Sequence, residues 1–179
     1  MSESELILGR FQPYNENGDA TDEIYSTKSI VEEIINIIGN EFIKGTVLDV
    51  GCGNCRFRKH LLKYAETYIG LDKYLENKDS IKGDIFSFNS KINTIWFMGS
   101  FFLHYPDYEK TLNRASEILE RDGSIIICDE IRRDNTEYKI PQPGYYDLNT
   151  LAETTNFKIV NTFIQENGIH FVKILKIIN

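Results

Sequence analysis

The stretch from Thr46 to Arg58, T-V-L-D-V-G-C-G-N-C-R-F-R, constrains the fold of this chain most strongly. It opens with a short run of apolar β-formers, which is typical of a strand buried on both faces. Gly51 and Gly53 then allow a sharp turn in which the backbone can approach a ligand closely. Apolar residues recur at helical spacing from Phe57 to Ala65, so the turn leads into a helix. The amides of a helix N-terminus favour a carboxylate or a phosphate.

Several classes of protein use such a turn. A Walker phosphate loop requires G-x-x-x-x-G-K-[ST], which is absent. The dinucleotide pattern G-x-G-x-x-G fails at its third glycine, where the chain has Arg56. Cys52 and Cys55 form a C-x-x-C at a helix start, as in thioredoxin-like redox proteins. This stretch alone does not decide between a redox site and the remaining pattern, D-x-G-x-G.

An acidic residue at the end of the next expected strand separates these two interpretations. Tyr68 to Asp72 reads as a strand that ends in a carboxylate. Asp72 lies about twenty residues beyond the turn, where nucleotide-binding α/β folds place an acid on the ribose hydroxyls. A carboxylate can accept hydrogen bonds from two vicinal hydroxyls. A thioredoxin-like protein has no need of this acid, so the spacing favours a ligand that contains ribose.

Four segments resemble class I S-adenosylmethionine-dependent methyltransferases. V-L-D-V-G-C-G resembles the first motif of that family, and K-G-D-I at 82–85 resembles its adenine-binding segment. F-F-L-H-Y-P-D at 101–107 resembles the stretch after the fourth strand in small-molecule methyltransferases. A-S-E-I-L-E-R-D-G-S-I-I-I at 115–127 resembles the family's helix, L-K-P-G-G turn and fifth strand. The motifs occur in the family's order.

The chain departs from the family pattern at three positions. Cys55 stands where many members have a further glycine, Asn93 where the fourth strand usually opens with Asp, and Asp122 where proline is usual. We expect Gly123 to end the preceding helix in the left-handed conformation. We also expect Asp107 and Asp147 to cap the helices that follow them.

The resemblance implies an α/β fold. We expect a Rossmann-like, doubly wound, mostly parallel seven-stranded sheet, with helices on both faces and an antiparallel last strand. The strands 157–165 and 170–178, joined at Asn167-Gly168, would form a terminal hairpin. Residues 1–25 are expected to be an N-terminal arm that could fold over a pocket as a lid, and residues 26–179 a single methyltransferase domain.

The resemblance further implies a cofactor site and a reaction. The cofactor would be S-adenosyl-L-methionine and the product S-adenosyl-L-homocysteine, with no metal. His104 is the first candidate for a catalytic base, because the unperturbed pKa of histidine lies nearest neutrality, and Glu130 is the second. The residues expected to bind the cofactor are Asp49, Gly51, Cys52, Gly53, Asp72, Lys73, Asp84, Ile85 and Met98.

The composition of the chain limits which binding partners and which cellular location we expect. The net charge of −7 over 179 residues argues against a broad nucleic-acid surface. The apolar runs are too short to span a membrane, the N-terminus does not read as a signal peptide, and three cysteines suit a reducing cytoplasm. We therefore expect a cytoplasmic enzyme that methylates O or N of a small molecule. An RNA or protein acceptor and a non-catalytic S-adenosylmethionine-binding module stay open as alternatives, and the oligomeric state is undetermined.

Overall fold

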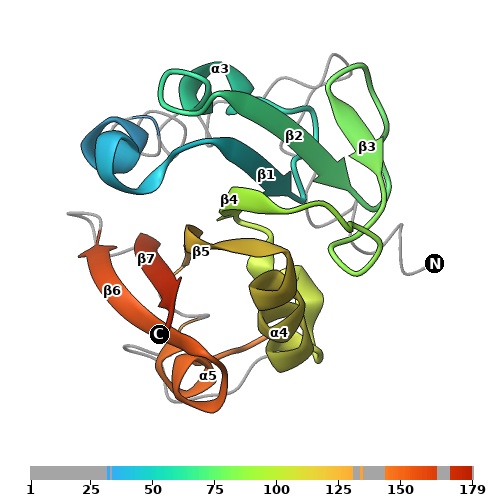
Figure 1. The fold of residues 1–179 in the computed structure, drawn as a ribbon. Coiled ribbons are helices and arrows are strands. Elements are labelled where there is room, and N and C mark those ends of the chain that lie inside the picture. The colour runs from blue at the N-terminus through green and yellow to red at the C-terminus, as the bar shows by residue number, and fades with distance from the viewer. Residues whose placement is uncertain (1–31, 33, 131–133, 135–143, 165–169, 179) are drawn as a thin grey trace.

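A seven-stranded sheet organises the computed structural model, which describes residues 32, 34–130, 134, 144–164 and 170–178 (Figure 1). The strand order is β3-β2-β1-β4-β5-β7-β6. Neighbours from β3 to β5 pair in parallel, whereas β7 is antiparallel to both β5 and β6. The expected fold class is confirmed. The strands are β1 (Thr46–Val50), β2 (Thr67–Asp72), β3 (Ser80–Lys82), β4 (Ile92–Met98), β5 (Leu119–Glu130), β6 (Phe157–Ile164) and β7 (His170–Ile177).

Helices cover both faces of this sheet (Figure 1). Side chains alternate along each strand, so Leu48 and Val50 of β1 point to one face and Val47 to the other. Leu48 and Val50 belong to a core cluster with residues of α4 (Tyr108–Ile118) and α5 (Leu148–Thr154). Val47 belongs to a second cluster with α3 (Arg58–Leu61) and the helical residues 34–42. The first strand is therefore buried on both faces, as its run of apolar residues predicts.

The end of α4 differs from expectation. The helix ends at Ile118 and the chain enters β5 at Leu119, and Gly123 lies inside the strand without a positive φ. The prediction of a left-handed cap at Gly123 was therefore wrong. A Cβ there would lie 2.7 Å from the backbone oxygen of Asn93 and 2.6 Å from Leu119 Cδ1. The glycine instead lets β5 approach β4 closely at the register shift between Ile92 and Thr94.

The two expected helix caps behave differently. The Asp147 carboxylate accepts hydrogen bonds from the amides of Asn149 and Thr150, so it caps α5 as predicted. Asp107 makes no such bond at the start of α4, and its carboxylate pairs with Lys110 at 2.5 Å. Asp107 thus occupies the predicted N-cap position of α4, but its side chain does not cap the helix.

Several expectations fall outside the described residues. The structure places β6 and β7 side by side as an antiparallel pair, while the Asn167-Gly168 turn is not among the described residues. The arm expected at residues 1–25 also lies outside them, so the division into an arm and a domain stays a prediction. Within the described part of the chain, no helix is long and apolar enough to span a membrane.

Candidate cofactor site

A cavity of about 210 Å³ lies at the carboxyl ends of the parallel strands β1 and β2, beside the segment that follows β4. In open α/β sheets this edge is where ligands bind. The wall comes from four separate segments of the chain. The lining residues are Val50, Gly51, Leu71, Asp72, Lys73, Tyr74, Gly83, Asp84, Phe86, Ser100, Leu103, His104, Tyr105 and Asp107.

The glycine turn after β1 forms one wall of the cavity. Gly51 has φ +73° and donates its amide to the Leu71 carbonyl at 2.7 Å. The Ser100 hydroxyl donates to the Val50 carbonyl at 2.6 Å. A Cβ on Gly51 would lie 2.6 Å from the Ser100 Cβ. Glycine is therefore required at position 51 both by the backbone conformation and by the close approach of Ser100.

Asp72 lines the cavity with its carboxylate held by three backbone amides. Oδ2 accepts from Gly53 at 3.0 Å, and Oδ1 accepts from Tyr74 and Leu75 at 2.9 Å each. Each carboxylate oxygen has about two lone-pair sites, so Oδ1 is filled by its two amides and Oδ2 keeps one site for a further hydrogen bond. The orientation is set before any ligand binds, which suits recognition of a ligand hydroxyl at Oδ2.

Asp84 lines the cavity on a loop that follows β3. Its Oδ1 accepts from the amides of Phe86 and Ser87 at 3.0 and 3.1 Å. The Ser87 hydroxyl donates to the Asp84 carbonyl at 2.7 Å. The backbone of the loop is therefore wound around this carboxylate in an Asx-type turn.

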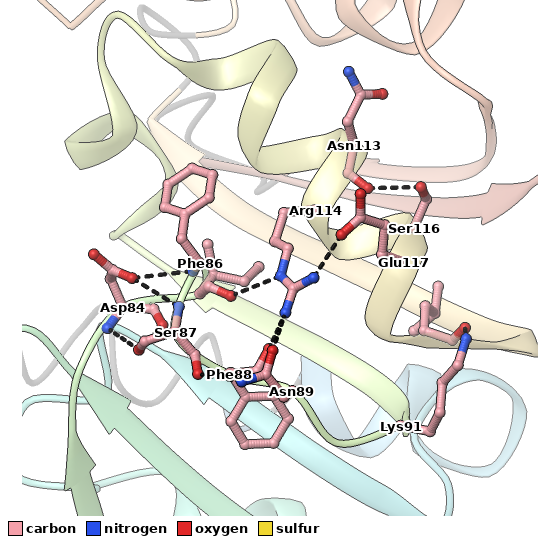
Figure 2. A network of polar contacts seen from close by, with 12 residues as sticks. Asp84, Phe86, Ser87, Phe88, Asn89, Lys91, Asn113, Arg114, Ser116 and Glu117 are labelled. Carbon is pink, nitrogen blue, oxygen red and sulfur yellow. Dashed lines mark hydrogen bonds and ion pairs between the residues drawn. The ribbon is translucent and has the colours of Figure 1, made fainter.

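Arg114 of α4 fixes this loop from outside the cavity (Figure 2). Its guanidinium donates to the carbonyl oxygens of Ile85 and Phe88 and, at 2.8 Å, to Asn89 Oδ1. It also pairs with Glu117 on the same helix. A planar guanidinium has five donors in a rigid fork, so this one residue can hold several acceptors of the loop at once.

His104 lies at the cavity, half-buried against aromatic rings. Its ring meets that of Phe97 edge-on, with centroids 5.5 Å apart. Burial lowers the pKa of His104 to about 4; the Asp84 carboxylate opposes the shift and the Lys73 ammonium adds to it. The imidazole is therefore neutral near pH 7. The near-neutral pKa on which its choice as a base depended does not apply in this environment.

Asp49 lies beneath the turn and does not line the cavity. Its side chain is buried, and the Tyr68 hydroxyl donates to Oδ2 at 2.7 Å. Burial raises the pKa of Asp49 to about 7, against the lowering effects of the Tyr68 hydrogen bond and the Arg56 charge. The carboxyl group thus links β1 to β2 from inside the protein.

The other expected residues divide into those at the cavity and those behind it. Gly51, Asp72, Lys73, Asp84 and His104 line the cavity, and Gly53 reaches it through its bond to Asp72. Ile85 is fully buried in one core cluster, Met98 packs at the edge of the other, and Cys52 is buried behind the turn. Glu130 ends β5, and its side chain is not described. None of the described residues forms a cluster suited to a metal ion, and the need for no metal stays a prediction.

Sequence reasoning did not identify several lining residues. Ser100 and Asp107 lie close to His104 in the sequence, yet their positions at the cavity depend on how the segment after β4 folds back. Phe86, Leu103 and Tyr105 line the cavity and belong to no sequence motif. In the structure their side chains are 46%, 39% and 60% exposed. Only their exposure in the fold reveals them.

Comparisons with known proteins show that this chain is similar to methyltransferases. Residues 48–127 match a family model described as "Methyltransferase domain". A protein assigned as a type 11 methyltransferase from Sulfolobus solfataricus is similar in structure, with 25% identity, a TM-score of 0.63 and coverage of 84% of this chain and 92% of that one. A SAM-dependent methyltransferase from Aquifex aeolicus has 16% identity, a TM-score of 0.64 and coverage of 82% and 89%. No curated protein matches the chain.

A further similar structure is the 1,6-didemethyltoxoflavin-N1-methyltransferase from Burkholderia thailandensis, solved with 1,6-didemethyltoxoflavin and S-adenosylhomocysteine. It has 14% identity, a TM-score of 0.70 and coverage of 98% of this chain and 88% of that one. Together with the site, these findings confirm the recognition made from the sequence. Residues 48–127 match a methyltransferase domain, and the fold of the chain is similar to that of S-adenosylmethionine-dependent methyltransferases.

The buried carboxyl of Asp49 predicts how stability depends on pH. Because its pKa is near 7 in the folded protein and about 4 when unfolded, the folded state binds the proton more tightly. The free energy of unfolding therefore falls by about 4 kcal/mol as the pH rises from about 4 to above 7. Asp49→Asn removes this contribution. Urea unfolding of both proteins at the two pH values would show it, and an equal change in both would contradict it.

The Arg114 contacts predict a local effect on the loop. In Arg114→Ala, the amides of Phe86 and Ser87 should exchange with solvent about tenfold faster, since hydrogen bonds from a charged donor are worth about 1.5–3 kcal/mol. Hydrogen exchange measured residue by residue tests this.

Glu117→Ala is the matched control for Arg114→Ala, because it removes the ion pair on the same guanidinium and leaves the loop contacts in place. Its exchange rates at the two amides should equal those of the unchanged protein. Equal rates in all three proteins would show that Arg114 does not hold the loop.

Proposed function

We propose that this protein transfers a methyl group from S-adenosyl-L-methionine to an oxygen or nitrogen of a small molecule. The observation that carries the proposal is the Asp72 carboxylate, which is fixed by three amides at a cavity beside the G-x-G turn. The site that remains on Oδ2 suits a hydroxyl of a ribose. Gly51 supports the same assignment, because a Cβ at this position would clash with the Cβ of Ser100.

Each part of the cofactor has candidate residues. Asp72 would accept from a ribose hydroxyl, and Asp84 and the amide of Ile85 would meet the adenine. The turn formed by Gly51, Cys52 and Gly53 would hold the amino-acid end, with Lys73 beside the ribose. Asp49 and Met98 would support this arrangement from the same face of the sheet behind the turn.

The reaction requires mainly alignment. When bound, the cofactor supplies a methyl group that is already electrophilic because it is attached to a sulfonium. The residues of this chain would orient an acceptor for in-line attack and exclude water, which lowers the barrier by removing motional freedom. The exposed apolar side chains of Phe86, Leu103 and Tyr105 at the rim suit an acceptor with an apolar or aromatic part.

Two observations favour a small acceptor. The similar Burkholderia thailandensis enzyme binds 1,6-didemethyltoxoflavin, and the net charge of −7 disfavours RNA. A protein or RNA acceptor, or a module that binds S-adenosylmethionine without catalysis, are the alternatives. We further propose a cytoplasmic location, no nucleic-acid or membrane partner, and a domain from residue 26 to 179 with residues 1–25 as an arm over the pocket.

Calorimetric titration with S-adenosylhomocysteine and S-adenosylmethionine tests the cofactor proposal. The unchanged protein should bind both, and Asp72→Ala should bind at least a hundredfold more weakly, because hydrogen bonds to a charged carboxylate are worth about 1.5–3 kcal/mol each. Asp79→Ala is the control, since Asp79 is an acid directly before β3 that pairs with Arg58 and does not line the cavity. A folded protein that binds neither compound would overturn the proposal.

We propose His104 as the catalytic base, with Glu130 as the second candidate. Because the pKa of His104 is lowered to about 4, the neutral form that accepts a proton is fully present above about pH 5. Methyl transfer should therefore show no histidine inflection between pH 6 and 8. His104→Gln should lower kcat about a hundredfold with an unchanged Kd for S-adenosylhomocysteine. An unchanged kcat at every pH would remove His104 from this role.

A further inference from the structure

Two cysteines lie together inside the turn that forms the candidate cofactor site. The sulfur atoms of Cys52 and Cys55 are 3.6 Å apart, and the Cys55 amide donates to the Cys52 carbonyl at 2.9 Å. Their exposed fractions are 7% and 6%. Both are free thiols. The site described above uses neither sulfur.

The backbone at Cys55 is unusual. Its φ is +60°, and it is the one non-glycine residue with positive φ in the described part of the chain. An ordinary side chain is disfavoured in this region, which glycine adopts freely. Strain of this kind persists where the surrounding structure requires it and is found at functional positions. The strained residue here is the one whose thiol faces a second thiol.

The strand beneath the turn leaves room for both sulfurs. A Cβ on Gly70 of β2 would lie 2.9 Å from Cys52 Sγ and 2.9 Å from Cys55 Sγ. Both thiols therefore pack on the same glycine, which holds them next to each other. Asn77 Oδ1 lies 3.9 Å from Cys55 Sγ.

The pair is connected directly to the candidate ribose site. Gly53 lies between the two cysteines and donates its amide to Asp72 Oδ2 at 3.0 Å. A disulfide needs its sulfurs about 2 Å apart, so closing it moves the two side chains that flank Gly53 toward each other. A backbone shift that accompanies this movement would change the geometry of the Gly53 to Asp72 hydrogen bond.

We propose that Cys52 and Cys55 are a site of oxidative modification, at which a hydroperoxide converts the two thiols to a disulfide that weakens cofactor binding. The effect on binding rests on the function proposed above; the disulfide itself does not. A C-x-x-C pair is the spacing at which neighbouring thiols commonly exchange with a disulfide.

The chemistry balances in two steps. The Cys55 sulfur attacks the peroxide, the O–O bond breaks, and a sulfenic acid and one water form. The Cys52 sulfur then attacks the Cys55 sulfur, the S–O bond breaks, and the departing hydroxide takes the Cys52 proton as the second water. Two thiols are oxidised and one hydrogen peroxide is reduced. Cys52 acts second because burial, with the nearby Asp49 and Cys55, raises the pKa of its thiol.

The proposal is tested on the full chain with hydrogen peroxide and S-adenosylhomocysteine as probes. Intact mass should fall by the mass of two hydrogen atoms, and peptide mapping should link Cys52 to Cys55. Calorimetry should show a Kd for S-adenosylhomocysteine at least about tenfold higher in the oxidised protein, the loss expected for one charge-assisted hydrogen bond. A thiol reductant should restore both the mass and the Kd.

Two variants sharpen the result. Cys55→Gly suits a φ of +60°, so it should fold, bind S-adenosylhomocysteine as the reduced protein does, and keep that affinity after peroxide. Cys128→Ser changes the third buried cysteine, on β5, and should stay sensitive to peroxide.

The outcomes separate the two proposals. Failure of native protein to form the Cys52–Cys55 disulfide overturns this inference, and so does a disulfide that leaves the Kd unchanged. If the reduced protein does not bind S-adenosylhomocysteine, the function proposed above fails and so does the effect on binding, while mass and mapping still decide whether the disulfide forms.

Discussion

The carboxylate of Asp72 is the interaction on which the candidate site depends. It accepts amides from two segments, the turn after β1 and the loop after β2. Hydrogen bonds to a charged acceptor contribute about 1.5–3 kcal/mol each, more than is typical of a neutral pair. The carboxylate therefore fixes the turn relative to β2, and the amides of Gly51 and Cys52 on the Leu71 carbonyl reinforce this link. The cavity keeps its shape because the turn after β1 and the loop after β2 are both hydrogen-bonded to the Asp72 carboxylate.

The remaining walls come from elements that reach the same edge of the sheet from elsewhere. Ser100, after β4, contacts the turn through the Val50 carbonyl. Arg114 of α4 holds the loop of Asp84 from behind (Figure 2). The carboxyl ends of parallel strands meet at one edge, so four segments distant in the sequence become neighbours there. Removing any support should loosen one wall before it unfolds the protein.

The three departures from the family pattern have physical explanations. Asn93 accepts the Thr46 amide at 2.9 Å and so joins the start of β4 to β1. Asp122 is exposed within β5, because the chain enters that strand at Leu119 and needs no proline turn. Cys55 retains the left-handed conformation that glycine adopts more easily. The Gly51 and Gly53 turn and the anchor at Asp72 are present together with all three departures.

The sequence by itself determined the fold class, the glycine turn and the acids at strand ends, because period, turn chemistry and spacing are local properties. Tertiary structure decided how these residues act. Burial moves the pKa values of His104 and Asp49 away from their ordinary values, and burial depends on the packing of distant segments. Gly123 illustrates the same limit: its sequence context indicates a helix cap, whereas the close approach of β4 makes it a strand residue. A local sequence pattern does not indicate which atoms from distant parts of the chain will pack against a residue.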